Sequence, residues 1–263
     1  MLWHEQSWPA IQKLDKQTPV VVPLGSCEQH GHHLPLFVDT MQVTGIAEGV
    51  HAKLADKILL TPTLWLGASD HHKDFPGTIS VSPSLYSQMI ESVTLSILRA
   101  GFRRILFLNG HGGNEIPAAQ ALTELVGKLD DADAACLAFN SWWKLGQAAL
   151  VPPAHGLVSP VITHACEWET SLMLFLRPDL VKQNLIDPKL APLPAAWHTG
   201  RWSGGKISVY HRFHRLTAAG HLGNPQIATP EKGKSMFNAL VNEIADFLEN
   251  FATWPHLAAL GPK

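Results

Sequence analysis

Short runs of apolar residues, each bounded by turn residues, predict the strands of this chain. The runs occupy residues 19–25, 58–66, 104–108 and 134–139. Continuous apolar runs of this length are typical of strands that are buried on both faces. Pro62 lies inside the second run, and proline has no backbone N–H to donate, so we expect an edge strand or a bend there.

Longer stretches with apolar residues at helical spacing alternate with these runs. They predict helices over residues 40–57, 83–100, 115–129, 167–176 and 230–251. Ser82 and Thr229 each stand directly before a proline, which is a typical start of a helix. Gly101 supplies a stop for the second of these helices.

The alternation of strands and helices predicts an α/β sandwich with a mostly parallel sheet. Residues 178–230 are rich in proline, glycine and tryptophan and show little periodicity. We expect them to form loops and short strands that decorate the same domain. No internal repeat or low-complexity segment interrupts the pattern, so we expect a single domain over residues 1–263.

The composition excludes several classes of protein. A hydrophobic fraction of 46% and a charged fraction of 16% fit a folded chain with a sizeable core. The net charge of −2 gives no attraction to nucleic acid or to an anionic membrane. No apolar run approaches the roughly 18 residues that a membrane span needs. The first residues lack the basic and apolar regions of a signal peptide.

The cysteines of the chain indicate no disulfide or zinc site, whereas its histidines indicate metal or proton chemistry. The three cysteines, Cys27, Cys136 and Cys166, show no C-x-x-C spacing, so neither a disulfide framework nor a thiolate zinc site is expected. A reducing, cytoplasmic location fits best. The 15 histidines are about twice the number that general composition suggests, and they are clustered. They direct attention to metal or proton chemistry.

The first polar cluster follows the first predicted strand directly. Glu28 and His30 are two residues apart, so they project to the same side of an extended segment. Asp39 follows nine residues later, just before a predicted helix. Two carboxylates and an imidazole that arrive together make a mixed nitrogen and oxygen metal site plausible.

A second cluster, Asn-Gly-His-Gly-Gly-Asn at residues 109–114, lies at the end of another predicted strand. Ligands of open α/β sheets bind outside the carboxyl ends of the strands, so His111 and the first cluster should share one crevice. Gly112 and Gly113 let the backbone approach a ligand, and their N–H groups near a helix start could stabilise a developing negative charge.

Two further polar segments accompany these clusters. One begins at His164 and continues through Glu167 and Glu169 into a predicted helix. The other is the loop Ser-Asp-His-His-Lys-Asp at residues 69–74, which contains Asp70 and His71. This loop follows the second predicted strand.

Each of these residues also has an ordinary structural explanation. Glu28 could form a surface salt bridge, and Asp39 could cap a helix. Glu167 and Glu169 could favour a helix N-terminus through the dipole. A single histidine is more often a surface or core residue than a ligand. The joint pattern is much rarer by chance than its parts.

The segments SCEQHGHHLPLFVD, FPGT, NGHGGN and HACEWETS, in this order and spacing, resemble the creatininase family of metal-dependent amidohydrolases. The motifs span residues from about 20 to 175, and the length of the chain also fits. The resemblance implies a three-layer α/β/α sandwich that assembles into homo-oligomers, often hexamers. It also implies two divalent metal ions per chain, with zinc as the first choice and manganese or iron as the others.

The resemblance carries roles to particular residues. Glu28 and His111 would hold one metal ion and His30 the other, with Asp39 as the bridge between them. His164 would match the catalytic histidine that handles a proton on the substrate nitrogen.

One departure from the family pattern concerns the second metal ion. In creatininase itself the NGH segment is followed by Tyr-Glu, and that glutamate is a ligand, whereas this chain has Gly112 and Gly113. Glu169 is the first substitute, as a ligand and catalytic residue, and Glu167 is the second. The Trp-Asp pair used for creatinine is replaced by Pro160 and Val161, which argues against creatinine as the substrate.

The resemblance therefore predicts hydrolysis of a non-peptide or cyclic amide or formamide C–N bond by a metal-activated water. His164 would give a proton to the leaving nitrogen. Gly112 and Gly113 would hold the oxyanion, and Asp70 and His71, with neighbouring residues of their loop, would line the mouth and bind a small-molecule substrate.

Two alternatives stay open. The same metal site could hydrolyse a cyclic, sugar-like ketone, with cleavage of a C–C bond or a ring. The missing glutamate also leaves room for a non-catalytic, metal-binding member of the family. The sequence does not show whether Cys27 or Cys166 touches a metal ion or is a small buried hydrophobe.

Overall fold

Parallel strands form the central sheet of the protein. The computed structural model describes residues 1–130, 135–190 and 209–255. Among these residues the sheet has four strands in the order β2-β1-β3-β4, and each neighbouring pair is parallel. Their bounds are Val20–Leu24 for β1, Leu59–Leu60 for β2, Arg104–Asn109 for β3 and Cys136–Ser141 for β4.

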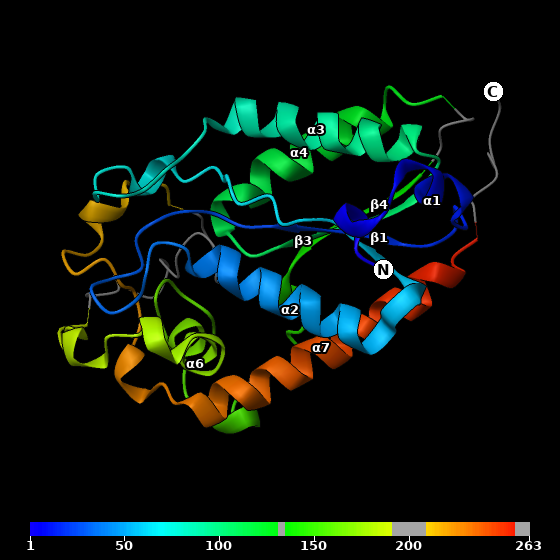
Figure 1. Ribbon diagram of the computed structural model, residues 1–263. Coiled ribbons are helices and arrows are strands. Elements are labelled where there is room, and N and C mark those ends of the chain that lie inside the picture. The colour runs from blue at the N-terminus through cyan, green and yellow to red at the C-terminus, as the bar shows by residue number, and fades with distance from the viewer. Residues whose placement is uncertain (131–134, 191–208, 256–263) are drawn as a thin grey trace.

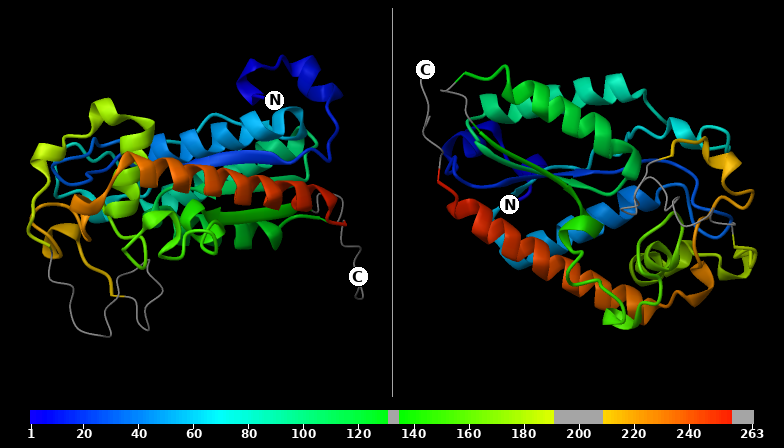
Figure 2. Two further views of the ribbon diagram at one scale, coloured as in Figure 1. Left: turned by 90° about the horizontal axis from the view of Figure 1, so that it is seen from below. Right: turned by 180° about the vertical axis from the view of Figure 1, so that it is seen from behind.

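Helices cover both faces of this sheet (Figure 1). The helices are α1 Trp8–Lys13, α2 Val38–Leu54, α3 Pro83–Arg99, α4 Glu115–Val126, α5 Trp142–Leu145, α6 Glu167–Leu176 and α7 Pro230–Thr253. α3 and α4 lie on one face, and α2 and α7 lie on the other, with α6 packed beside them at one end (Figures 1 and 2). The predicted three-layer α/β/α sandwich is confirmed.

The two faces of the sheet explain the continuous apolar runs. Successive side chains of a strand point to opposite faces. Val20 and Val22 therefore pack with Tyr86 of α3, while Val21 packs with Ile46 of α2. Full burial of each such side chain contributes about 1.5–3 kcal/mol.

Helix starts follow the sequence signals closely. The Ser82 hydroxyl accepts a hydrogen bond from the backbone N–H of Leu85 at 3.3 Å, and Thr229 accepts one from that of Lys232 at 3.3 Å. Gly101 has φ +98°, the left-handed region that favours glycine, and it follows the end of α3.

The observed elements differ from the prediction at several boundaries, most of all in two strands. Strand 58–66 shrinks to Leu59–Leu60, because Pro62 breaks the hydrogen-bonded ladder, and the chain touches the sheet again only at the bridge between Leu24 and Leu64. The strand predicted at 134–139 runs from Cys136 to Ser141, and position 134 lies outside the described residues.

A helix and a long connection also differ from the prediction. α2 begins at Val38, so Asp39 lies in its first turn rather than before it. The segment 178–230 was expected to contain short strands. Its described parts, 178–190 and 209–230, contain 3-10 turns and no strand, because their polar and proline-rich sequence does not continue the sheet.

The carboxyl ends of the parallel strands place the polar segments at one edge of the sheet. The segment after β1 contains residues 25–37, and the turn after β3 contains the 3-10 helix Gly112–Asn114. The 3-10 helix Asp70–His72 follows β2 in the chain. The described residues contain no helix that is long and apolar enough to span a membrane.

Candidate metal centre

Asp39 lies at the centre of a buried polar cluster. Its Oδ1 is 3.0 Å from Nε2 of His30, and its Oδ2 is 2.9 Å from Nδ1 of His111. The three side chains come from the first turn of α2 and from the segments after β1 and β3. Each carboxylate oxygen of Asp39 therefore faces a different imidazole, which is the arrangement a bridging ligand needs.

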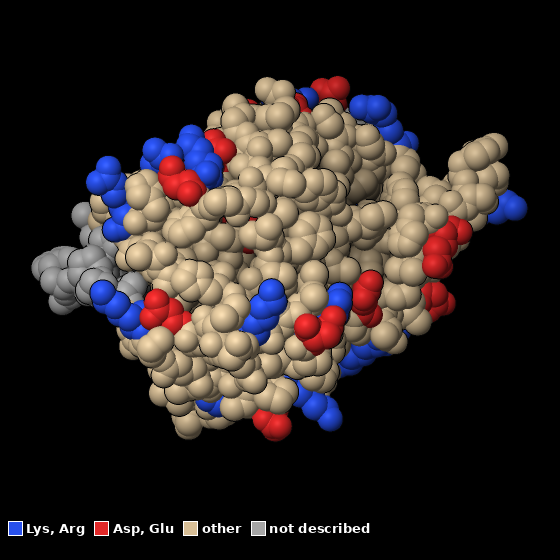
Figure 3. Space-filling model, turned by 60° about the vertical axis from the view of Figure 1, so that its left-hand side comes forward, with Lys and Arg blue, Asp and Glu red and all other residues tan. Residues whose placement is uncertain are grey.

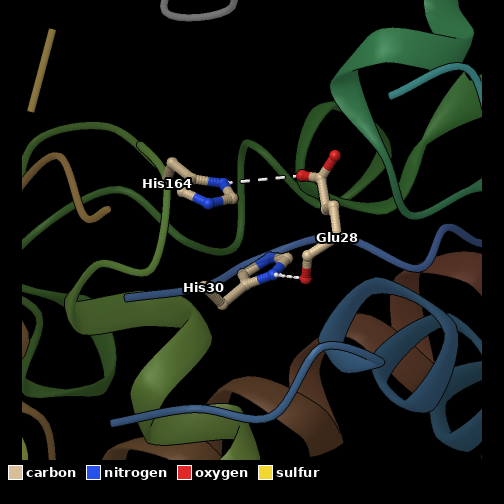
Figure 4. A group of neighbouring side chains, drawn as sticks. All are labelled: Glu28, His30 and His164. Atoms are coloured by element: carbon tan, nitrogen blue, oxygen red, sulfur yellow. Dashed lines mark hydrogen bonds and ion pairs between the residues drawn. The ribbon is translucent and has the colours of Figure 1, made fainter. Parts of the chain in front are cut away.

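Glu28 is surrounded by imidazoles. Its Oε1 lies 3.4 Å from Nδ1 of His111, 3.3 Å from Nε2 of His72 and 3.7 Å from Nδ1 of His164. Figure 4 shows the His164 ring directed at this carboxylate and the His30 ring next to that of His164, with its Nδ1 toward the backbone carbonyl of Glu28 at 3.1 Å. Glu28 is 1% exposed, so its charge depends on these neighbours.

Glu169 joins the cluster from the first turn of α6. Its Oε1 is 4.0 Å from Nε2 of His30, and its other oxygen accepts a hydrogen bond from the backbone N–H of Ala165. Gln42 donates to the backbone carbonyl of Glu169 at 2.8 Å, which links α6 to α2. His30, Asp39 and Glu169 thus present ligand atoms within 4.8 Å of one another.

Glu167 points away from this cluster. Its Oε1 accepts a hydrogen bond from Nζ of Lys232 at 2.7 Å, and its Oε2 accepts one from the backbone N–H of Ser159 at 2.7 Å. Of the two glutamates that the sequence left open, the structure brings Glu169 to the cluster and does not bring Glu167.

Gln29 fixes the orientation of two histidine rings. Its Oε1 accepts from the N–H of Gly31 at 2.9 Å, so its amide nitrogen donates to the carbonyl of Gly220 at 2.9 Å and to Nδ1 of His72 at 3.0 Å. His164 donates from Nε2 to the backbone carbonyl of Gln29 at 2.7 Å. This hydrogen-bond network assigns a lone pair to Nδ1 of His164 and a proton to Nε2 of His72.

Ion pairing within the cluster shifts the pKa values of Asp39, His30 and His111. Burial opposes ionisation of Asp39, but the charges and hydrogen bonds of His30 and His111 together outweigh it and hold the pKa of Asp39 below its usual range. Burial also opposes the charged form of His30 and His111, yet the carboxylates of Asp39 and Glu28 raise the pKa of His30 to about 9 and that of His111 to about 10. Without a metal ion, protons on the imidazoles neutralise the carboxylates.

The outer residues behave differently. Burial raises the pKa of Glu169 to about 7 and also raises that of Glu28. Burial, together with neighbouring imidazoles, holds the pKa of His164 and of His72 well below the usual range. Both histidines are therefore neutral and can accept or pass a proton.

The cluster fits divalent metal ions. Glu28 Oε2 is buried and makes no hydrogen bond to the described residues, and His30 Nε2 and Asp39 Oδ2 are buried at ion-pair distance from their partners but without hydrogen-bond geometry. Buried atoms of this kind are normally satisfied, and a metal ion would satisfy them. Imidazole nitrogens and carboxylate oxygens suit zinc, manganese and iron.

The residues predicted to bind substrate fall in different places. Asp70 is exposed and accepts a hydrogen bond from Ser80 at 2.9 Å. The ring of His71 reaches the cluster and stacks on His111, with ring centroids 5.6 Å apart and an angle of 13° between the planes. A Cβ atom on Gly113 would collide with the Ala68 carbonyl and with His111, so this position requires glycine.

Two residues of the site, Gln29 and Phe213, were missed from the sequence, and a third, His72, was expected in a different place. Gln29 stands within the EQHG segment, and its neighbours were the only signal. His72 was expected at the mouth but is buried beside Glu28. Phe213 carried no signal, yet its ring lies 4.1 Å from that of His72 and 4.6 Å from that of His164, so it closes this side of the cluster.

The cysteines lie outside these ligand groups. Cys27 and Cys166 are buried and free, and neither belongs to the three candidate ligand sets among the described residues. Burial raises the pKa of Cys166 to about 12, which keeps it a thiol.

Asp74, in the loop that also contains Asp70 and His71, forms ion pairs with Arg212 and, at 2.6 Å, with His214.

A parallel sheet that carries a buried group of imidazoles and carboxylates at its carboxyl edge is an arrangement suited to metal-dependent hydrolysis. The model of the Creatininase family, described as creatinine amidohydrolase, matches residues 4–248, and the chain belongs to this family. The family resemblance predicted from the sequence is therefore confirmed.

The chain is also similar to proteins that are named for different activities. The chain is 33% identical over 252 residues to the mycofactocin precursor peptide peptidase of Mycobacterium tuberculosis, covering 89% of this chain and 85% of that protein. It is 28% identical over 261 residues to the 3-dehydro-scyllo-inosose hydrolase of Thermotoga maritima, covering 91% of this chain and 81% of that protein.

The fold matches solved creatininases. A crystal structure of creatinine amidohydrolase has a TM-score of 0.80 at 25% identity, covering 97% of this chain and 98% of that chain. Other structures similar to this chain are described as a Zn-Zn type of a mutant creatininase and as a Mn form of creatininase.

Proposed function

We propose that this protein is a dinuclear metal-dependent hydrolase that cleaves a non-peptide or cyclic amide or formamide C–N bond. The observation that carries the proposal is the position of Asp39 between His30 and His111, with one oxygen toward each. Glu28 would complete the site of His111, and Glu169 that of His30. We propose zinc as the first choice for both ions, with manganese or iron as alternatives.

Bound ions would supply water activation near neutral pH and polarisation of the carbonyl group under attack. The protein supplies the proton path. His164 is neutral, and its Nδ1 lone pair faces the cluster while Nε2 is held by the backbone carbonyl of Gln29. His164 can therefore take up a proton at Nδ1 and return it to the leaving nitrogen.

The residues around His164 would limit the access of water and the shape of substrate that fits. Phe213 packs against His164 and His72, so one side of the site is aromatic and buried. We propose that the backbone N–H groups of Gly112 and Gly113 hold the developing oxyanion, since they precede the N-terminus of α4. Asp70 would contact the substrate from the 3-10 helix Asp70–His72, which follows β2 in the chain.

The experiment that tests this proposal combines metal content with a substrate screen. Protein purified without chelator should contain about two transition metal ions per chain. It should then release amine, ammonia or formate from cyclic amides or formamides, and chelation should abolish that release. Full turnover after complete removal of metal would contradict the proposal. Short peptides belong in the screen, because the 33% identical relative is named a peptide peptidase.

A second candidate is hydrolysis of a cyclic, sugar-like ketone. The similarity to the 3-dehydro-scyllo-inosose hydrolase of Thermotoga maritima supports it. Opening of cyclic ketones without any release of amine, ammonia or formate from amides would favour this candidate. The same metal centre would serve both reactions.

Several expectations about the whole protein remain part of the proposal. We propose a single catalytic domain over residues 1–263, a homo-oligomer such as a hexamer, and a reducing, cytoplasmic location. The three cysteines are free. Figure 3 shows charges of both signs scattered over one face, with no large patch of a single sign, which supports a small-molecule substrate over nucleic acid. Native mass spectrometry tests the oligomeric state.

A further inference from the structure

His71 lies closer to the cluster than a residue of the substrate mouth would need to be. It belongs to the 3-10 helix Asp70–His72. Its ring is nearly parallel to that of His111, at an angle of 13°. Glu28, His71 and His111 each offer a ligand atom, and these atoms all lie within 4.8 Å of one another.

We propose that His71 is a ligand of the metal ion held by Glu28 and His111. This inference rests on the proposed dinuclear site, and it adds an imidazole that the family resemblance does not assign. The ion would then be held by His71, His111, Glu28 and one oxygen of Asp39. Imidazole nitrogens and carboxylate oxygens are donors that zinc takes, and a water molecule would enter as a further ligand.

The neighbouring His72 does not fit this role, although its Nε2 lies close to Glu28. Its Nδ1 accepts a hydrogen bond from the Gln29 amide at 3.0 Å, so its proton resides on Nε2. That same Nε2 faces Glu28 at 3.3 Å. A protonated nitrogen has no lone pair for a metal ion. His72 would therefore orient Glu28, and of the two adjacent histidines only His71 would bind the ion.

The loop that carries His71 is fastened to His111 itself. Ser69 lies with its hydroxyl 3.1 Å from Nε2 of His111, and its backbone N–H donates to Ser80 at 2.8 Å. The backbone N–H of His72 donates to the carbonyl of Ser69 at 2.8 Å. These contacts fix the rings of His71 and His111 relative to each other before any ion is bound. This preorganisation lowers the entropy cost of coordination.

Gly113 supplies the space for this arrangement. A Cβ atom there would lie 2.8 Å from Cε1 of His71 and would also collide with His111. A side chain at position 113 and the imidazole of His71 therefore exclude each other in this geometry. The glycine is required for the approach of His71.

The test compares His71→Phe with wild-type protein in titrations with Zn²⁺ and Co²⁺ alone. Phenylalanine keeps a ring for the contacts with His111 and Phe213 but removes both nitrogens. We expect affinity at one of the two sites to fall by at least about tenfold, since loss of an outer partner of a ligand already costs about 10–100-fold. The visible spectrum of the Co²⁺ form should change, and affinity at the other site should not.

Two further variants keep the result interpretable. His71→Ala should show the same loss at one site if phenylalanine packs poorly. His32→Phe is the matched control, because His32 lies on the same segment as His30 but is exposed, and its metal binding should equal wild type. The melting temperature of each metal-free variant identifies any general loss of fold.

Metal affinities and a Co²⁺ spectrum equal to wild type in both His71 variants would overturn the proposal. Wild-type protein that binds no metal would overturn it together with the proposed function. Loss of one site on mutation of His71, in a protein that hydrolyses no amide, would support the ligand role while the proposed reaction fails.

Discussion

The candidate metal centre has two halves that differ in chemistry. The imidazole half consists of Glu28, His71 and His111, with His72 and His164 nearby. The carboxylate half consists of His30, Asp39 and Glu169. The first half thus offers mainly nitrogen donors, and the second offers mainly oxygen donors.

This difference predicts unequal metal preferences. Imidazole suits zinc, copper and iron, whereas carboxylate suits magnesium, calcium and manganese better. Asp39 belongs to both halves through its two oxygens. In the proposed dinuclear site one aspartate would therefore couple two metal sites of different character, and substitutions on either side would separate them experimentally.

Asp39→Ala should have the largest effect, because it removes the shared ligand. We expect both metal ions to be lost and turnover to fall by more than the roughly 10²–10⁴-fold that a general acid–base residue contributes. Metal analysis by inductively coupled plasma mass spectrometry checks this. An Asp39→Ala protein with full metal content would show that the halves do not meet at this residue.

His164→Ala should separate proton transfer from metal binding. The expected outcome is full metal content with kcat reduced by about 10²–10⁴-fold, because the group that handles the leaving-nitrogen proton is gone. Steady-state kinetics and metal analysis on the same sample provide the measurement. If His164→Ala lost one metal ion as well as activity, His164 would instead be a ligand of the ion held by Glu28.

Metal binding should release protons, and affinity should rise with pH. In the metal-free protein the pKa of His30 is about 9 and that of His111 about 10, so both are charged at neutral pH. Each must lose its proton to bind an ion, so each site should gain about tenfold in affinity per pH unit below those values. Titration calorimetry in two buffers of different ionisation enthalpy counts the protons. Affinity that is independent of pH between about 6 and 8 would argue against these ligands.

Glu169→Gln should weaken only the carboxylate half. We expect one ion to bind about 10–100-fold more weakly while the other is retained. Glu167→Gln is the comparison, because Glu167 pairs with Lys232 outside the cluster. That variant should keep both ions and lose stability instead, as shown by thermal unfolding. If Glu167→Gln lost an ion, the assignment of the two glutamates would be reversed.

Gly113→Ala should give the smallest effect and act on the imidazole half. The added methyl group meets His111 and the Ala68 carbonyl, so we expect a loss of about 1–3 kcal/mol in the free energy of unfolding. Denaturant unfolding of the metal-free protein measures it. Equal weakening of both metal sites would show that the two halves respond as one unit.

The sequence predicted the fold well where local signals and burial agree. Pro83 and Pro230 open α3 and α7 as expected from the Ser-Pro and Thr-Pro pairs. Pro62 shortened its strand more than expected, because the extent of a sheet edge depends on neighbouring strands. Local pattern carries no information about that pairing.

The site was predictable where its residues share a short segment. Glu28, His30 and Asp39 stand within twelve residues, so their joint appearance was visible in the sequence. The choice between Glu167 and Glu169 depended on how α6 is rotated against α2, which only the packed structure shows. Phe213 reaches the site from a segment far along the chain, and no spacing rule connects it to His72.

The cluster draws its side chains from widely separated parts of the chain, from Glu28 through His111 to Glu169. Loops of this length must close before any pair of them can hold an ion, and that closure carries an entropy cost. A partly folded chain would therefore bind these metals poorly. Metal ions that bind the native state alone stabilise the whole domain rather than one element. Metal uptake by a growing or refolding chain should consequently be a late event, and its rate can be used to time the completion of the fold.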